Sequence, residues 1–455
     1  MKIPVQPLLA ALLATSAISL TGCLPEDPYL ERDVRDDVFY FVMPDRFDNG
    51  DLTNDTGGIS GDRLDHGFDP YDKGMYHGGD MQGLEGQLDY LQGLGITAIW
   101  MTPILKNQTI QGDSSAYHGY WTLDFTKIDP HLGSNADLQS LIDAAHDRNM
   151  KVYFDIITNH TADVIKYEEC HEPDGSSNGS PCTYVSLADK AAGMGYTPFL
   201  PAGQENVKSP AWLNDPQYYN NQGDTTFSGE NSIYGDFFGL DDLDTRQPAV
   251  VQGMIDIFKD IVSEFKPDGF RIDTVKHVDI EFWQEFSPAL LAHAHAEGIP
   301  NFFMFGEVYE GNPQVLSQFT TIGTLPSVLD FGIQGAASSV FAGQGGSSNL
   351  AGLFAQDDVY TDADSDASVL MNFGGNHDMG RIGMFIQNAN PTASDEEKLA
   401  RAKLFNAIMF FARGIPVIYY GDEQGFTGDG GDKDAREDMF PSLVDVYNDN
   451  VLIGT

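Results

Sequence analysis

Short runs of β-branched and aromatic residues recur along the chain, separated by segments with helical periodicity. The runs that we expect to form strands are residues 39–42, 97–100, 152–155, 269–273, 303–307, 327–331, 369–373 and 416–420. Apolar residues of the 138–145 segment fall at helical spacing, and Ser394 with Glu397 predicts a capping box that opens a helix. Eight strands alternating with helices favour a (β/α)8 TIM barrel, although an open doubly wound sheet fits the same pattern.

One connection breaks this alternation. Residues 161–240 are rich in Gly, Asn, Pro, Ser and Tyr, and they are too many for a βα loop. We therefore expect an inserted small domain after the third strand, with the barrel made of residues 38–160 and 241–455. The chain continues past the eighth strand with little helical pattern, which indicates that the last barrel helix is missing.

Composition and charge narrow the function. With 41% hydrophobic residues the chain can form a sizeable core, which excludes a globally disordered or fibrous protein. The net charge of −43 repels phosphate backbones, so we expect no nucleic-acid partner. The acidic excess is spread along the chain, which is typical of solubility in a salty exterior.

The N-terminus predicts export. Lys2 precedes an apolar run over residues 8–20, which has the charge and length of a signal peptide (residues 1–22) and is short for a membrane span. The run ends in Leu20-Thr21-Gly22-Cys23, which resembles a bacterial lipobox with Cys23 lipidated; the alternative is an ordinary signal peptide with a chance cysteine. Residues 23–37 would be a polar tether. Leu24 after the cysteine favours the outer membrane, with an extracellular protein as the alternative.

Two further cysteines, Cys170 and Cys182, lie in the predicted insertion. Because an exported protein reaches a compartment that permits disulfides, we expect them to pair. The alternatives are a metal site or a catalytic thiol, but no further cysteine lies nearby in the sequence to support either of them.

Acidic residues end two consecutive predicted strands. Strand periodicity puts Arg271 and Asp273 on one face of their strand, and the arginine would keep the carboxylate ionised. Glu307 ends the next strand, so a barrel would bring it close to Asp273. Two carboxylates that flank a bond are the minimum machinery of a glycosidase. A structural ion pair or a metal site would also explain the pair.

The motifs together are more specific. Residues 155–160, 269–277, 306–308 and 376–378 resemble the four conserved regions of the α-amylase family, glycoside hydrolase family 13, in order on strands three, four, five and seven. Residues 95–103, 118–121 and 414–421 are similar to its secondary motifs. Members usually carry a C-terminal β-sandwich domain, which this sequence does not show.

The resemblance implies a retaining mechanism. Asp273 would be the nucleophile, Glu307 the general acid/base, and Asp378 the acid that helps distort the sugar; Arg271 would orient Asp273. The residues that the resemblance assigns to substrate binding are His118, Tyr120, His160, Lys276, His277 and His377.

The resemblance also implies calcium. One ion would join the barrel to the insertion through Asn159, Asp242 and the carbonyl of His277, with Asp241 or Asp244 as alternatives to Asp242. Oxygen ligands of this kind suit calcium. A second loop resembles a calcium site of cyclodextrin glucanotransferases, with a solvated acidic turn as the alternative; its residues are Asn49, Asp51, Asn54, Asp55, Gly78 and Asp80.

The sequence thus predicts a monomeric enzyme that hydrolyses internal α-1,4-glucosidic bonds of starch-like polysaccharides and maltooligosaccharides. A transglycosylase, or a cyclodextrin- or maltogenic-type enzyme of the same family, would share the covalent intermediate. An inactive glucan-binding lipoprotein is the alternative of another class. The retained acids at Asp273, Glu307 and Asp378 argue against it.

Overall fold

A computed structural model describes residues 28–455, and within them eight strands form one parallel sheet in the order β14-β13-β12-β7-β2-β1-β16-β15. A bridge between Leu329 and Met371 joins the two ends, so the sheet closes into the predicted barrel. The barrel strands are β1 (Phe39–Val42), β2 (Ala98–Met101), β7 (Lys151–Ile157), β12 (Gly269–Asp273), β13 (Phe303–Gly306), β14 (Ser327–Val328), β15 (Met371–Phe373) and β16 (Ile415–Tyr419).

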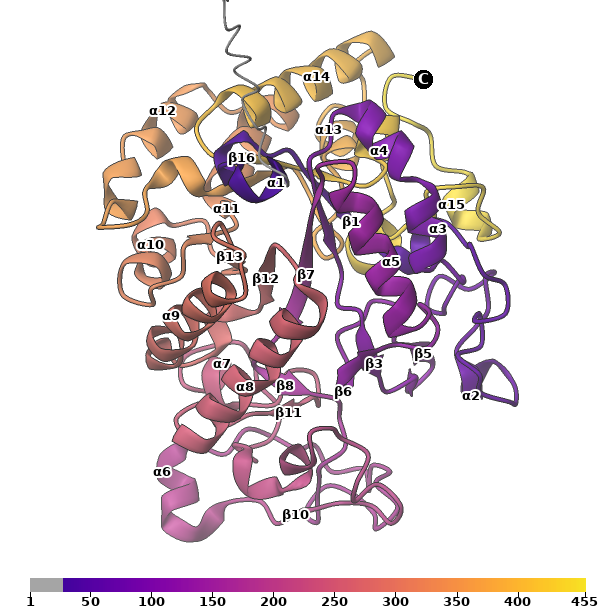
Figure 1. The fold of residues 1–455 in the computed structure, drawn as a ribbon, viewed down its shortest axis with the longest axis vertical. Helices are drawn as coiled ribbons and strands as arrows, with labels where there is room; N and C mark the ends of the chain where they lie inside the picture. The colour runs from indigo at the N-terminus through magenta and orange to yellow at the C-terminus, as the bar shows by residue number, and fades with distance from the viewer. Residues whose placement is uncertain (1–27) are drawn as a thin grey trace, which may run out of the picture.

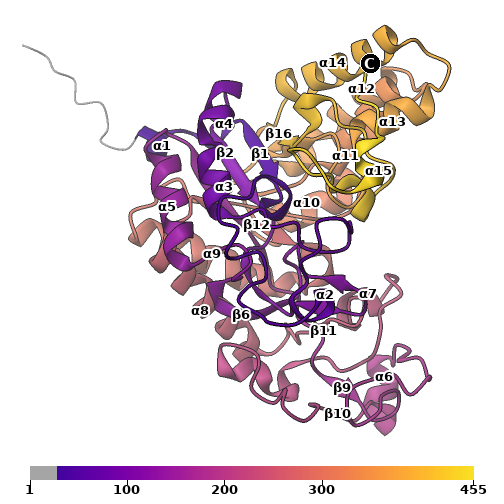
Figure 2. The same cartoon turned by 90° about the vertical axis from the view of Figure 1, so that its right-hand side faces the viewer.

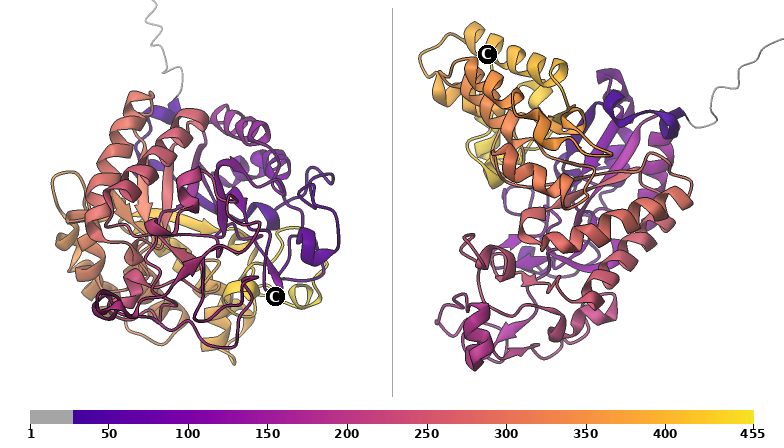
Figure 3. Two further views of the ribbon diagram at one scale, coloured as in Figure 1. Left: turned by 90° about the horizontal axis from the view of Figure 1, so that it is seen from below. Right: turned by 90° about the vertical axis from the view of Figure 1, so that its left-hand side faces the viewer.

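Helices surround the strands (Figures 1 and 3). Those in the connections between barrel strands are α2 (Arg63–His66), α3 (Met81–Gly86), α4 (Leu88–Leu94), α5 (Asn135–His146), α8 (Pro248–Phe265), α9 (Ile280–Ala296), α10 (Pro313–Thr321), α11 (Phe331–Ala337), α12 (Ser348–Phe354), α13 (Ile382–Ala389) and α14 (Asp395–Phe411). Beyond β16 the described chain holds 3-10 turns and α15 (Asp445–Asn448). No helix among residues 28–455 combines the length and apolar character needed to cross a membrane.

The predicted elements are confirmed, with shifted ends. The buried positions of α5 are those with helical spacing in the sequence, and Ser394 caps α14 by accepting a hydrogen bond from the Glu397 amide. β14 is shorter than predicted because Asp330 turns away from the strand and caps α11 through the amide of Ile333, at 2.8 Å. β15 starts late because residues 367–369 form a 3-10 turn.

The segment between β7 and α8 extends from one end of the barrel, where α6 and β10 lie at the bottom of Figure 1. Its elements are β8 (His160–Thr161), β9 (Lys166–Tyr167), α6 (Leu187–Asp189), β10 (Pro198–Phe199), α7 (Asn231–Tyr234) and β11 (Asp241–Asp242). β8 pairs with β11 where this segment leaves and rejoins the barrel. The β2–β7 connection adds β3 (Leu105–Asn107), β4 (Ile110–Gln111), β5 (Ser114–Ser115) and β6 (Thr122–Ile128).

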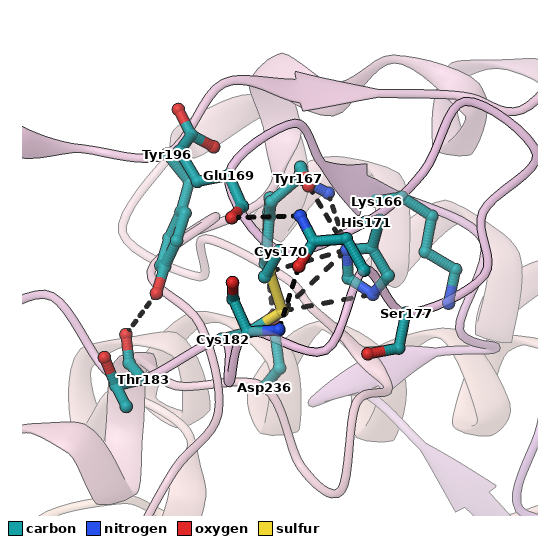
Figure 4. The surroundings of a disulfide bond; sticks show 12 residues. Lys166, Tyr167, Glu169, Cys170, His171, Ser177, Cys182, Thr183, Tyr196 and Asp236 are labelled. Atoms are coloured by element: carbon teal, nitrogen blue, oxygen red, sulfur yellow. Dashed lines mark hydrogen bonds between the residues drawn. A yellow bond between two sulfur atoms is a disulfide. The ribbon is translucent and has the colours of Figure 1, made fainter.

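The cysteine pairing is confirmed: Cys170 and Cys182 form a disulfide (Figure 4). The His171 ring lies against it, with Nδ1 at 3.5 Å from the Cys170 sulfur. These three residues are the one cluster of metal-ligating His, Cys, Asp and Glu side chains found in the described part of the chain. Both sulfurs are used in the covalent bond, so the pair acts as a cross-link of the insertion.

Residues 28–37, predicted as part of a free tether, instead bind the barrel. They form α1 (Pro28–Glu31) and a 3-10 turn, at the opposite end of the barrel from α6 (Figures 1 and 2). Arg32 donates to the carbonyls of Thr97 and Asn149, at 3.0 and 2.9 Å, just before β2 and β7. Lys151 donates to the Arg32 carbonyl at 2.8 Å. A polar side chain of this segment therefore binds backbone carbonyls at the starts of the barrel strands. Cys23 and the predicted signal peptide lie outside the described residues.

Candidate active site

One buried arginine joins three carboxylates at the carboxyl ends of adjacent strands. Arg271 is fully buried, and its Nη1 donates to Asp155 Oδ1 at 2.7 Å and to Asp273 Oδ1 at 2.8 Å. Its Nη2 donates to Glu307 Oε2 at 2.6 Å. Strand register produces this arrangement, because Arg271 stands opposite Asp155 on β7 and the Glu307 amide bonds to the Ile272 carbonyl at 2.9 Å.

A single positive charge cannot balance three carboxylates away from water, so protons are retained. Burial raises the pKa of Glu307 to about 8; Arg271 opposes this shift, and the charges of Asp273 and Asp378 add to it. Burial likewise raises the pKa of Asp155 to about 7. Glu307 therefore keeps its proton at neutral pH, beside a second carboxylate that faces the same opening.

Asp378 is held from a different direction. Arg436, in the loop after β16, donates from Nε to the His377 carbonyl at 3.0 Å and from Nη2 to Asp378 Oδ1 at 3.2 Å. Burial raises the pKa of Asp378, but nearby positive charge outweighs it and leaves the pKa below the usual range. Burial lowers the pKa of His377 to about 3, so at neutral pH this charge comes from Arg436 and Arg271.

These residues line one cleft of about 680 Å³. Tyr120 lies parallel to His377, with ring centroids 5.4 Å apart, and its hydroxyl donates to Asp155 at 3.0 Å. Burial lowers the pKa of His118 and of His160, so these imidazoles are neutral hydrogen-bonding groups. The sequence-predicted residues that line the cleft are His118, Tyr120, His160, Asp273, Lys276, His277, Glu307, His377 and Asp378, with Arg271 buried beneath them.

Two backbone positions explain the local shape. Gly119 has a φ of +89°, and a Cβ there would lie 1.9 Å from the Pro103 carbonyl, so only glycine lets the loop present His118 and Tyr120. Thr274, at φ 52°, turns the chain left-handed directly after β12 and directs its amide towards Glu307 Oε2.

Several site residues were not predicted as such. Trp100 donates to Asp155 Oδ2 at 3.2 Å and stacks on Phe41. Arg436 lies beyond all the motifs, and no local pattern announces it. Phe227, Phe237, Phe238 and Tyr309 also line the cleft, and Phe238 is 72% exposed. The adjacent Phe237 and Phe238, followed by Gly239, were the signal available in the sequence.

The first predicted calcium set is partly assembled. His160 pairs with Asp242 through β8 and β11, which brings Asn159 beside Asp242. Asp242 is buried and accepts from the Asn220 amide group at 2.7 Å. Burial raises its pKa well above the usual range, and Asp236 adds to the shift. The His277 ring bonds to the Ser232 carbonyl at 2.5 Å.

The second predicted set forms a compact loop. Asn49 donates to Asp55 at 2.8 Å, and Asn54 donates to Asp80 at 3.0 Å. The amide oxygens of both asparagines are buried and have no hydrogen-bond partner within residues 28–455. A Cβ on Gly78 would lie 2.7 Å from Asp55 Oδ1. Asp80 also caps α3, whereas Asp51 is directed to Thr53.

A comparison with protein families decides the assignment. The model for the alpha amylase catalytic domain matches residues 41–450. The chain belongs to the α-amylase family. An alpha-amylase of Streptomyces lividans is 50% identical over 418 residues, which cover 87% of this chain and 45% of that protein. The chain therefore spans less than half the length of this relative.

Further relatives and solved structures resemble the chain at lower sequence identity. A cyclomaltodextrin glucanotransferase of Thermoanaerobacterium thermosulfurigenes is 30% identical, over 87% of this chain and 50% of that protein. Among solved structures, an Anoxybacillus alpha-amylase superposes with a TM-score of 0.69 at 30% identity, covering 92% of this chain and 77% of that one.

Proposed function

We propose that this chain is a retaining hydrolase that cleaves internal α-1,4-glucosidic bonds of starch-like polysaccharides and maltooligosaccharides. The observation that carries the proposal is the Arg271 guanidinium, which holds Asp273 and Glu307 side by side at the base of the cleft. Retaining glycosidases place their two carboxyl groups close together, about 5 Å apart, because one of them attacks the sugar directly.

The geometry gives each group a step. Glu307, protonated at neutral pH, donates its proton to the leaving glycosidic oxygen as Asp273 attacks the anomeric carbon. Glu307 then takes a proton from water, and the hydroxide equivalent breaks the glycosyl–Asp273 ester. Asp378 and the neutral imidazoles of His118 and His377 border the same space, where they would bind sugar hydroxyls.

The test is release of reducing ends from soluble starch by the purified protein, with pullulan as the comparison substrate. We expect release from starch with products that keep the α configuration, read by proton NMR in the first minutes. An inactive glucan-binding protein would bind maltooligosaccharides in a calorimeter and release nothing. Products that begin as β anomers would rule out the retaining assignment.

Transglycosylation is a second candidate, favoured by the aromatic rings at one side of the cleft. Phe237 and Phe227 pack edge-on against His277, at 5.3 and 5.8 Å, and Phe238 and Tyr309 remain exposed there. Aromatic faces in this position would hold an acceptor sugar and displace water. A time course of products distinguishes the two: transfer yields products longer than the substrate or cyclic ones before short sugars accumulate.

We also propose that the chain binds calcium at two places. The buried amide oxygens of Asn49 and Asn54, with the Asp55 carboxylate, offer hard oxygen ligands that lack other partners in the described chain. At the second place, the buried carboxylate of Asp242 beside Asn159 would gain a counter-charge. A calcium ion bound at this second place would cross-link the insertion to the barrel.

Excess chelator should lower the melting temperature, since an ion that binds only the folded state stabilises it in proportion to its occupancy. Asn54→Ala and Asp242→Asn should each remove about one calcium per chain in metal analysis, which assigns the two places separately. A protein that contains no calcium after dialysis against calcium buffer, with an unchanged melt in chelator, would overturn both sites.

For location, we propose export and lipid attachment at Cys23, which places the protein in the cell envelope. Two or three acyl chains give stable anchoring, because each buried methylene contributes about 0.8 kcal/mol. After expression in a bacterium that processes lipoproteins, Cys23→Ser should move the protein out of the membrane fraction. A wild-type protein that stays unmodified and unattached would refute the lipid anchor.

A further inference from the structure

The loops after β15 and β16 are joined by two arginines, each of which reaches from one loop to the other. Arg436, from the second loop, reaches back to the first, where it binds the carbonyl of His377 and the carboxylate of Asp378. The two loops also join through their backbones, because the amide of Asp432 donates to the Asp378 carbonyl at 2.9 Å. Asp378 is therefore positioned by a neighbouring loop, and not by its own strand alone.

Arg381 makes the reverse connection. It follows Asp378 by three residues, and its Nε donates to Glu437 Oε2 at 2.6 Å. Its Nη1 donates to the Tyr420 carbonyl at 2.7 Å and to Asp422 Oδ1 at 2.9 Å. None of these contacts lines the cleft, so Arg381 has no direct route to a substrate.

We propose that Arg381 is a positioning residue for the reaction: it fixes Glu437, and thereby Arg436, so that Arg436 holds the Asp378 carboxylate towards the substrate. This inference rests on the role of Asp378 in the proposed glucan hydrolase. Since Arg436 and Glu437 are adjacent in the chain, an ion pair that fixes one of them fixes the backbone of the other.

Burial makes this connection stiff. Arg381 is fully buried, Glu437 is 4% exposed, and the Tyr419 ring lies 4.3 Å from the Arg381 guanidinium. The second oxygen of Glu437 accepts from the Asn450 amide at 2.8 Å, so both of its oxygens are used. A buried pair that loses one partner leaves an uncompensated charge, and the loop must then rearrange.

The competing interpretation is that Arg381 only stabilises the fold. The chain offers a matched control in Arg413, which also binds two carboxylates, Asp330 and Asp357. Arg413 lies just before β16, at the end of the barrel away from the cleft. Its loss should cost stability in the same way, without any path to Asp378.

The test compares Arg381→Met, Arg381→Lys and Glu437→Gln with Arg413→Met, at a temperature where all four remain folded. Kinetics on a maltooligosaccharide should show kcat lowered about 10-fold to 100-fold in Arg381→Met and Glu437→Gln. Losses of this size are typical of residues that orient a site residue without contacting the substrate. KM should change little, and Arg381→Lys should recover part of kcat. Arg413→Met should lower the melting temperature only.

Two further measurements test whether the effect of Arg381 on catalysis passes through Arg436 and Asp378. When Arg436 moves away from Asp378, the carboxylate loses a positive neighbour, so the acid limb of the rate profile should move to higher pH. Arg436→Lys combined with Glu437→Gln should lose less than the product of the single losses, because both changes break one connection. If Arg381→Met does not fold, Glu437→Gln carries the comparison.

A Glu437→Gln enzyme with the wild-type kcat and acid limb would overturn the inference. So would strictly multiplicative losses in the combined variant. Failure of the proposed function is a separate result, because it would appear as a wild-type protein that releases no reducing ends from starch.

Discussion

The two halves of the candidate site are built by different means. On β12 and β13, strand register alone brings Asp273 and Glu307 to one buried guanidinium, and Arg271 is itself a strand residue. At β15 and β16, Asp378 depends on an arginine from another loop. The first half is rigid because the sheet is rigid, whereas the second is only as rigid as the contacts between two loops.

The largest effect should come from the half built on strands. Asp273→Asn removes the proposed nucleophile and Glu307→Gln removes the proposed proton donor, so each should lower kcat on starch by about 10³-fold or more. Both variants should still bind maltooligosaccharides, as measured by calorimetry, because the other sugar contacts remain. Turnover near the wild-type rate in either variant would sink the catalytic assignment.

Next in size is the change at the loop-built half. Arg436→Lys keeps a positive charge but loses the fork that binds the His377 carbonyl and Asp378 together. We expect a loss of about 10-fold to 100-fold in kcat/KM, by analogy with other orienting contacts. A loss as large as that of Asp273→Asn would show that the two halves do not differ as described.

The pH profile sharpens the comparison at neutral to alkaline pH. Because burial raises the pKa of Glu307 to about 8, its proton is present below that pH and is lost as pH rises through it. Activity should therefore fall about tenfold per unit above pH 8. Glu307→Gln should abolish this limb in the residual activity, and an alkaline limb several units away would contradict the assignment of Glu307.

The smallest effect on catalysis should follow loss of the disulfide, which lies in the insertion away from both halves. Replacing Cys170 and Cys182 with serine should lower the free energy of unfolding by about 2–3 kcal/mol, as expected for a cross-link that closes a short loop. The rate on starch should stay within about twofold of wild type. A large loss of turnover at a temperature where the variant is folded would mean that the insertion shapes the cleft.

Local patterns predicted much of this structure, and the reason lies in the register of the strands. The period of two in β12 gives the shared face of Arg271 and Asp273, and the order of strands then supplies Glu307. The same holds for the buried positions of α5. Features that depend on residues close together in the chain could therefore be predicted from the sequence.

The features that were not predicted depend on contacts between residues that are far apart in the sequence. Arg436 lies 58 residues from Asp378 and has no distinctive neighbours, so nothing local connects the two. Residues 28–37 have a polar composition typical of a linker, yet Arg32 and Lys151, 119 residues apart, bind this segment to the barrel. A polar side chain can face water or satisfy a backbone carbonyl, and composition does not distinguish these outcomes.

The attachment of residues 28–37 determines which end of the barrel would lie near the membrane if Cys23 carries the proposed lipid. The segment lies at the amino ends of the strands, at the opposite end of the barrel from the insertion (Figures 1 and 2), whereas the cleft is lined by residues that follow the carboxyl ends of the strands. Cys23 precedes Pro28 by five residues, which span about 18 Å at most when fully extended. An acyl group on Cys23 would thus keep the amino ends of the barrel strands close to the lipid, with the cleft at the end of the barrel that faces away from it.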